Sequence, residues 1–315
     1  MVYLRNVLFN IGFLKSRAFH TPTICVGNLS VGGTGKTPMI EFLVQSFKDD
    51  YKISVLSRGY GRKSKGFVVA NTTTTVLDLG DEPFQIFSKF PRIIVAVDAD
   101  RRHAIKVLEE KYSPDIIFLD DAYQHRKVTP SLAILLTAYD NLYTEDWYLP
   151  TGNLRDSRGE AKRASIIVIT KCPKEISATE MNTIIKKIKP ELHQKIIFSY
   201  LAYDTQLKGG EEELFVKHLK GKEITLVTGI ANPKPLLSYL TDNEIKIEHL
   251  HYRDHHFFTD KELELFNSKE FILTTEKDYV RLKGKIENLY YISISHKFLN
   301  KGEGMLQECI KSVMK

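Results

Sequence analysis

The segment ICVGNLSVGGTGKTPMIEFLV, residues 24–44, decides the fold of this chain. Residues 24–29 form an apolar run rich in branched side chains, which predicts a buried strand. A glycine-rich turn follows at residues 30–37, and Pro38, a residue suited to the first turn of a helix, opens the apolar-periodic residues 39–47. A strand, a glycine loop ending in Lys-Thr and a helix are together typical of a phosphate-binding P-loop.

The parts of such a loop have separate roles. Backbone N–H groups surround the phosphate oxygens, and the helix N-terminus adds positive potential. Lys36 is expected to reach the terminal phosphates and the Thr37 hydroxyl to ligate Mg²⁺. Ser30 stands where the pattern usually begins with glycine, so we interpret the loop as a variant. The expected nucleotide-binding residues are Gly32, Gly33, Thr34, Gly35, Lys36 and Thr37.

Composition limits the class of protein. A chain of 315 residues is long for one core, so we expect two domains. The 45 Lys and Arg against 39 Asp and Glu give a formal charge of +6, which suits anionic ligands or an anionic membrane surface but lacks the dense basic patch of a nucleic-acid binder. The three cysteines lie far apart without CxxC spacing, which argues against zinc or disulfides and fits a reducing cytosol.

The N-terminal residues 1–22 have an unusual pattern. Apolar residues recur there at helical spacing beside basic ones, and two interpretations remain open. One is a helix packed on the core, and the other is an amphipathic helix at a membrane surface. The apolar positions are Leu4, Val7, Leu8, Ile11 and Leu14.

Basic and acidic residues follow the next predicted strands and helices. Arg58 lies in the basic loop 57–66 at the C-terminal end of strand 53–56, where α/β sheets bind ligands, although a solvated loop is the alternative. Arg101 opens helix 99–112, an unfavourable place for a cation unless it serves an anion. Asp81 begins another helix, where it is either a functional acid or a favourable first-turn charge.

An apolar strand in residues 115–121 ends in Asp120 and Asp121. Downstream of a P-loop, such a strand matches the one that supplies the Mg²⁺-binding carboxylate, and which of the two aspartates does so stays open. A later strand ends in Thr170, Lys171 and Cys172, without the aspartate of the Asn-Lys-x-Asp motif that reads guanine. The sequence therefore favours ATP over GTP.

The strand and helix pattern predicts an α/β fold with two domains. We expect a P-loop NTPase-like αβα sandwich at residues 23–203, a linker or hairpin at 204–222 and a smaller α/β domain at 223–315. In the smaller domain, His255 and His256 beside Asp254 make a poor zinc set, so acid–base work or a polar turn is the better interpretation.

Seven motifs occur in a fixed order along the chain: GNLSVGGTGKTP, LSRGYGR, GDEP, DDAYQH, LPTGNLR, DHHFF and TTEKD. With them, the chain resembles the tetraacyldisaccharide 4′-kinase family of lipid A biosynthesis over about residues 5–282. The resemblance implies two α/β/α domains with the active site in a cleft between them, which the smaller domain closes. It implies ATP-dependent phosphorylation of the 4′-hydroxyl of a tetraacyldisaccharide 1-phosphate, which yields lipid IV-A. It also implies a peripheral enzyme on the cytoplasmic face of the inner membrane, and we expect a monomer.

The resemblance also implies roles for single residues. Lys36 and Thr37 would hold the phosphates and Mg²⁺, and Asp120 and Asp121 would ligate the metal. Asp81 matches the base for the 4′-hydroxyl proton, and a histidine of the DHH segment, His255 rather than His256, would be its partner. Arg155 would face the nucleotide phosphates, and the residues expected to face the substrate are Arg58, Arg101 and Gln124.

Two positions depart from the family pattern. Asp156 stands where the family often has Glu, which shortens its reach to a metal or water, and the N-terminal apolar segment is short, which weakens the expected membrane attachment. Two other functions stay open: a P-loop switch or metallochaperone-type NTPase, and a nucleotide-binding adaptor without catalysis. The switch would typically carry a second Lys where this loop has Val31.

Overall fold

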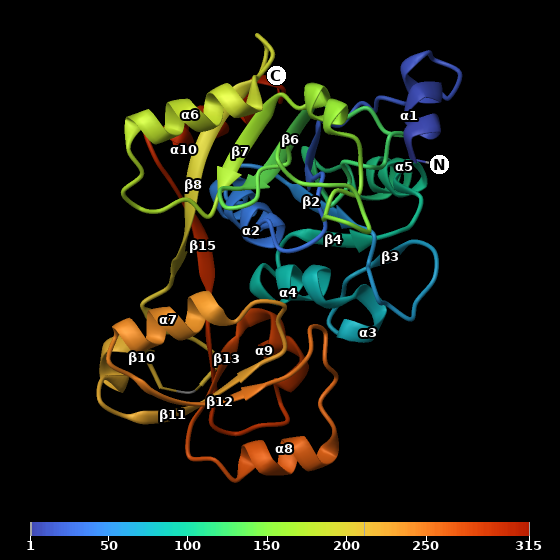
Figure 1. Ribbon diagram of the computed structural model, residues 1–315. Coiled ribbons are helices and arrows are strands. Elements are labelled where there is room, and N and C mark those ends of the chain that lie inside the picture. Colours follow the sequence, from blue (N-terminus) through green and yellow to red (C-terminus); the bar gives the residue numbers. More distant parts are fainter. Residues whose placement is uncertain (1, 211, 315) are drawn as a thin grey trace. The chain divides into compact units, whose positions relative to one another are not determined.

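A mostly parallel sheet with the glycine loop near its centre forms the framework of the larger part of the chain (Figure 1). The computed structural model describes residues 2–210 and 212–314 and divides into two compact units. The described parts of Met1–Leu201 and His296–Lys315 form the first unit, and those of Ala202–Ser295 form the second.

The first unit contains a nine-stranded sheet within the described residues. The neighbouring pairs from β8 to β4 in the spatial order are all parallel, and β3 runs antiparallel to β4 at the edge. In spatial order the strands are β15 (Ile294–Phe298), β8 (Lys195–Tyr203), β7 (Ile166–Thr170), β6 (Leu132–Ala138), β1 (Thr23–Asn28), β5 (Ile116–Asp120), β2 (Ile53–Ser57), β4 (Ile94–Val97) and β3 (Val68–Val69).

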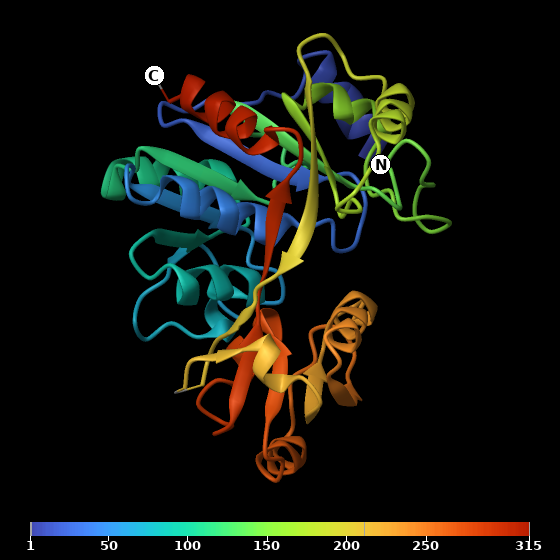
Figure 2. The same cartoon turned by 90° about the vertical axis from the view of Figure 1, so that its left-hand side faces the viewer.

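Helices cover both faces of this sheet, because successive residues of a buried parallel strand point to opposite faces. Ile24 and Val26 of β1 join the core formed with α2 (Lys36–Phe47), α4 (Asp81–Lys89) and α10 (Gly302–Ser312). Cys25 joins the opposite core with α5 (Arg101–Tyr112) and α6 (Ala178–Ile188), and Figure 2 shows α10 in red and α6 in lime on the two sides of the sheet. Three short elements complete the unit: α1 (Val2–Asn10), α3 (Val76–Leu79) and the 3₁₀ helix η1 (Arg158–Arg163).

The second unit repeats the αβα arrangement on a smaller scale. Its parallel sheet has the order β12 (Lys246–His251), β11 (Glu223–Thr228), β13 (Ile272–Thr275), β14 (Leu289–Ile292). Helix α7 (Lys234–Asp242) packs into one core, and α8 (Asp260–Asn267) and α9 (Glu276–Leu282) pack into the other. The remaining elements are β9 (Gln206–Leu207), β10 (Leu214–Phe215) and the 3₁₀ helix η2 (Val216–Leu219).

The α/β class and the P-loop sandwich are confirmed, but the division of the chain differs from the expected ranges in two places. Residues 296–315 complete the first unit, because α10 buries Leu306 and Ile310 against its sheet. Residues 204–222, expected as a linker, belong to the second unit, because Leu207 and Leu219 are buried in its core. Met1, Glu211 and Lys315, which fall within the expected ranges, lie outside the described residues.

Helix α10 therefore contributes to the stability of the first unit. Leu306 is fully buried, so Leu306→Ala removes apolar contacts and leaves a cavity, and we expect it to lower the free energy of unfolding by about 2–5 kcal/mol. Met305 on the same helix is 37% exposed, and Met305→Ala should change the free energy of unfolding by about 0.5 kcal/mol or less. Urea unfolding followed by circular dichroism measures both, and equal effects would contradict the packing of α10.

Candidate active site

The glycine loop connects β1 to α2 and is open on its outer side. A Cβ atom added at Gly32 or Gly33 would meet no atom within 4 Å, so a ligand can approach the backbone closely there. Gly35 has a φ of 86° and caps α2, which lets the helix begin at Lys36. The sequence placed Pro38 in the first turn of this helix, and in the structure Pro38 is its third residue.

The backbone conformation and contacts of Ser30 show why a serine can stand where the P-loop pattern usually has glycine. It is absent from the positive-φ residues of the described chain, so its position does not require glycine. Its backbone pairs with Leu154, and its hydroxyl donates to Asp146 Oδ2 at 3.3 Å. The Val31 N–H donates to the Asn153 carbonyl at 2.8 Å. The segment 153–155 thus pairs with the start of the loop and fixes its position.

Asp120 and Asp121 lie next to this loop, because β5 pairs with β1 and Asp120 is in register with Val26. Asp121, which follows the end of β5 with a φ of 46°, carries a carboxylate that accepts from both terminal nitrogens of Arg155. Lys36 Nζ lies 3.9 Å from Asp121 Oδ1. The structure therefore brings together Lys36, Asp120, Asp121 and Arg155.

Asn28 organises this cluster from the last position of β1. Its amide donates to Thr34 Oγ1 at 2.8 Å, and its side-chain oxygen accepts from Arg155 at 2.6 Å. Its backbone carbonyl accepts from the Gln124 amide at 2.8 Å. Sequence reasoning missed Asn28, although a polar residue that ends the strand before a P-loop was a signal that could have identified it.

The two carboxyl groups have opposite electrostatic environments. Burial, followed by the neighbouring charge of Asp121, raises the pKa of Asp120 to about 7, although Lys36 and a hydrogen bond from Ser57 oppose the shift. Burial also acts to raise the pKa of Asp121, but Lys36 and Arg155 outweigh it and hold that pKa below its ordinary value. Asp121 is therefore the ionised member of the pair, and Asp120 lacks comparable cationic support.

This asymmetry makes stability depend on pH. The folded protein binds a proton at Asp120 up to about pH 7, whereas the unfolded chain loses it near pH 4, so this carboxyl lowers stability as pH rises across that window. Asn cannot ionise. Asp120→Asn should therefore stabilise the metal-free protein relative to wild type by on the order of 2 kcal/mol at about pH 8, and by much less near pH 4.5.

Urea unfolding in EDTA at both pH values measures this difference. Asp121→Asn is the matched control, because it removes a carboxylate whose ionised form is stabilised, and it should destabilise the protein at about pH 8. A difference between wild type and Asp120→Asn that does not vary with pH would contradict the raised pKa.

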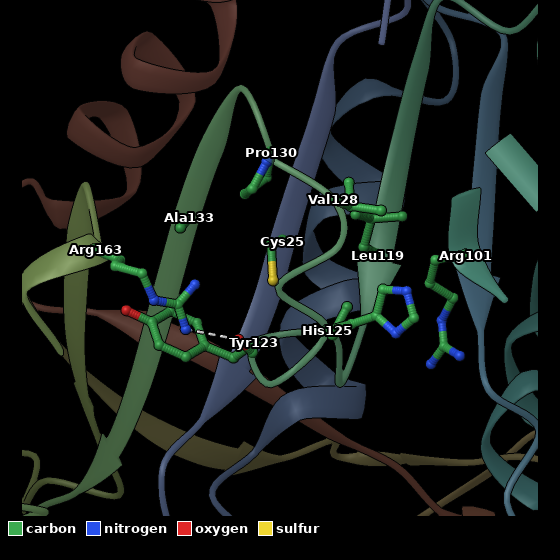
Figure 3. Close-up of a pocket in the computed structure, with 10 residues that line it drawn as sticks. Cys25, Arg101, Leu119, Tyr123, His125, Val128, Pro130, Ala133 and Arg163 are labelled. Atoms are coloured by element: carbon green, nitrogen blue, oxygen red, sulfur yellow. Dashed lines mark hydrogen bonds between the residues drawn. The ribbon is translucent and has the colours of Figure 1, made fainter. Parts of the chain in front are cut away.

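Arg101 is buried at the start of α5 and lines a small pocket (Figure 3). Its Nη1 donates to the Asp98 carbonyl at 2.7 Å, and its Nε has no hydrogen-bond partner. Burial, then the positive charge of Arg101, lowers the pKa of His125 to about 4, so this ring is neutral. The pocket is lined by Cys25, Arg101, Leu119, Ala122, Tyr123, His125, Val128, Pro130, Ala133 and Arg163.

Arg58 and Asp156 differ in burial and in the part of the protein that each side chain contacts or influences. Arg58 is exposed, and its charge acts with burial to lower the pKa of Arg101. Asp156 is buried and turned toward α1, where its Oδ1 accepts from the Asn6 amide at 2.6 Å. In this structure, Asp156 anchors the N-terminal helix.

Asp81 is buried at the first position of α4, where the helix dipole favours a negative charge. It follows Gly80, whose φ is 88° and where an added Cβ would lie 2.6 Å from the Tyr60 carbonyl oxygen. Only glycine fits this approach, so the GDEP motif fixes where Asp81 enters the helix.

His255 lies in the second unit, in the loop before α8, with a φ of 60°. Lys277 Nζ lies 3.0 Å from its Nε2 and Arg281 Nη2 lies 3.2 Å from its Nδ1. Lys277 and Arg281 only donate hydrogen bonds, and a neutral imidazole accepts at one of its two nitrogens, so the ring accepts from one of these neighbours at a time. His256 instead contacts Glu262 at 3.0 Å and stacks on Tyr252.

Comparison with known proteins agrees with these motifs. The family model described as tetraacyldisaccharide-1-P 4′-kinase matches residues 1–315. A tetraacyldisaccharide 4′-kinase from Flavobacterium johnsoniae is 48% identical, covering 94% of this chain and 88% of the relative, and one from Bacteroides thetaiotaomicron is 41% identical, covering 90% and 80%.

A solved structure extends the likeness to three dimensions. LpxK from Aquifex aeolicus, crystallised in complex with ATP, matches with a TM-score of 0.81 and 30% identity, covering 100% of this chain and 95% of that one. This chain belongs to the tetraacyldisaccharide-1-P 4′-kinase family.

Proposed function

We propose that this protein transfers the γ-phosphoryl group of ATP to the 4′-hydroxyl of a tetraacyldisaccharide 1-phosphate. The observation that carries the proposal is the Lys36–Asp121–Arg155 cluster beside a glycine loop with an open outer side. Phosphoryl transfer needs positioning and charge neutralisation more than covalent help from the protein, and this cluster supplies fixed charges at the helix N-terminus.

ATP is the proposed nucleotide for two reasons. The strand that reads guanine in GTP-binding relatives ends here in Thr170, whose hydroxyl donates to the Thr34 carbonyl at 2.9 Å and so supports the loop. The Aquifex relative was crystallised with ATP.

The oxygen donors of the site fit Mg²⁺. The described residues contain no group of three His, Cys, Asp or Glu side chains that could hold a metal, and Mg²⁺ typically takes one or two carboxylates together with substrate phosphates. We assign Asp120 and the Thr37 hydroxyl as its ligands, because Asp121 is already paired with Arg155 and Lys36 whereas Asp120 is buried with a raised pKa. When bound, the ion neutralises charge on the phosphate oxygens.

Asp81 and His255 are proposed to handle the proton of the attacking hydroxyl. The assignment rests on the GDEP and DHH motifs and is supported by the burial of Asp81 and by the donors around the His255 ring. A carboxylate that accepts this proton makes the oxygen a better nucleophile, and general acid–base catalysis contributes about 10²–10⁴-fold in rate.

A phosphoryl-transfer assay tests the reaction itself. Protein, Mg-ATP labelled at the γ-phosphate and tetraacyldisaccharide 1-phosphate are combined in detergent micelles, and label is expected in a bisphosphorylated lipid. Lys36→Ala should abolish this product, because it removes the cation that contacts the phosphates. If the label is released only as free phosphate, with or without lipid, the protein is a switch-type NTPase and the proposed kinase activity is wrong.

The proton-handling residues are tested by matched variants in the same assay. Asp81→Asn and His255→Asn should each lower kcat about 100-fold or more while the Kd for ATP stays within about twofold. His256→Asn is the control for the neighbouring ring, which is engaged by Glu262, and its kcat should fall by no more than about threefold. If His256→Asn is as inactive as His255→Asn, or if Asp81→Asn loses ATP affinity, the roles must be reassigned.

We also propose that the N-terminal segment contacts an anionic membrane surface at the cytoplasmic face of the inner membrane. Helix α1 ends at Asn10, so Ile11 and Phe13 follow it in a turn and are 69% and 74% exposed. Exposed Lys15 and Arg17 lie beside them, a combination suited to anionic lipid headgroups. In the described chain, no helix combines the length and apolar character that crossing a membrane requires.

Cosedimentation with vesicles of phosphatidylethanolamine and phosphatidylglycerol tests this contact. The double variant Ile11→Glu/Phe13→Glu should bind about tenfold more weakly, because it adds charge and removes two apolar contacts. Leu192→Glu, at a fully exposed apolar residue beyond α6, makes the same chemical change elsewhere and should bind like wild type. If wild type, the double variant and Leu192→Glu bind the vesicles equally, the N-terminal segment does not contact the membrane.

A further inference from the structure

Two consecutive carbonyl groups of the glycine loop are held by side chains from distant parts of the chain. The Thr34 carbonyl accepts from the Thr170 hydroxyl at 2.9 Å, and Thr170 ends β7. The Gly35 carbonyl accepts the first hydrogen bond of α2, from the Met39 N–H at 3.1 Å, and a second one from His296 Nε2 at 2.9 Å; His296 lies in β15. Both donors are buried, with exposures of 0% and 3%.

These contacts fix the orientation of two peptide groups. A trans peptide is planar, so its C=O and the N–H of the next residue point in opposite directions. Holding the Thr34 carbonyl toward Thr170 turns the Gly35 N–H away from β7. Holding the Gly35 carbonyl toward His296 likewise turns the Lys36 N–H away from β15.

His296 is itself held in one state. A carbonyl only accepts, so Nε2 carries the proton, and in the neutral ring Nδ1 is then the acceptor beside the buried Ser199 hydroxyl at 3.1 Å. Burial lowers the pKa of His296 to about 4, against the opposing hydrogen bond to Gly35. A Cβ at Gly35 would lie 3.0 Å from His296 Nε2, so the ring packs directly against the loop.

We propose that His296 and Thr170 are positioning residues of the nucleotide site, which orient the Gly35 and Lys36 N–H groups toward the phosphates of ATP by holding the carbonyls behind them. The inference rests on the proposed function, because it assigns phosphates to the open side of the loop. Neither side chain touches the nucleotide, and both act through the backbone.

The test compares side chains of similar reach that differ in the donor. His296→Gln keeps an N–H donor near the position of Nε2, whereas His296→Met fills similar space without one. Thr170→Ser keeps the hydroxyl and Thr170→Val removes it. Isothermal titration with Mg-ATP in the absence of lipid gives the Kd, steady-state transfer assays give kcat and KM, and thermal unfolding verifies the fold of each variant.

We expect His296→Met and Thr170→Val to raise the Kd for Mg-ATP about five- to tenfold, the effect of one lost hydrogen bond to a phosphate-binding peptide. His296→Gln and Thr170→Ser should stay within about twofold of wild type, and kcat at saturating ATP should fall less than the Kd rises. Rescue by the donor-keeping variants separates orientation from packing.

Three outcomes decide against the inference or its basis. Wild-type affinity in His296→Met and Thr170→Val would overturn it, as would equal losses in the donor-keeping and donor-free variants, which indicate packing alone. If His296→Met does not fold, the Thr170 pair decides by the same criterion. If wild type itself does not bind Mg-ATP, the proposed function fails, a result that is distinct from wild-type binding unchanged by the variants.

Discussion

A phosphate-binding loop is constrained by the geometry of the peptide bond. Each N–H group that faces a ligand has a carbonyl on its far side, and a buried carbonyl needs a donor. Here the Thr34 carbonyl takes its donor from a residue 136 positions later. The Gly35 carbonyl accepts from the Met39 N–H of α2 and takes a second donor from a residue 261 positions later. The loop is local in sequence, but its support depends on the order of strands in the sheet.

The strand order also separates the two neighbouring aspartates into different roles. The pairing of β5 with β1 places both aspartates beside Lys36. Asp121 leaves the strand with a positive φ and pairs with Arg155, whereas Asp120 stays within the strand and is buried. Because two adjacent carboxylates without cations repel each other, pairing one of them leaves the other suited to bind a cation. The sequence alone left open which aspartate ligates Mg²⁺. Because Arg155 pairs with Asp121, we favour Asp120 as the ligand.

Local patterns predicted local structure well. The P-loop strand and helix and the aspartates at the end of β5 were accessible from periodicity and from the residues that follow apolar runs. Contacts between distant residues were not accessible. His296 lies in none of the motifs, and the contacts of Asn28 with Thr34 and Arg155 cannot be inferred from the motif that contains it. Ile11 and Leu14 continue a helical spacing beyond Asn10, where the helix ends. Apolar periodicity reports burial on one element and says nothing of which later strand lies beside it.

The position of His296 follows from how the second unit is inserted. The chain leaves the first unit after Leu201 in β8 and returns at His296 in β15, and these two strands are neighbours in the large sheet. An inserted domain is tolerated where its two ends lie close together, and neighbouring strands meet this condition. The first residue after the insertion contacts the nucleotide loop. The first unit therefore completes the contacts of this loop only after the chain has passed through the whole second unit, and His296 supports the loop although it lies 261 positions after Gly35.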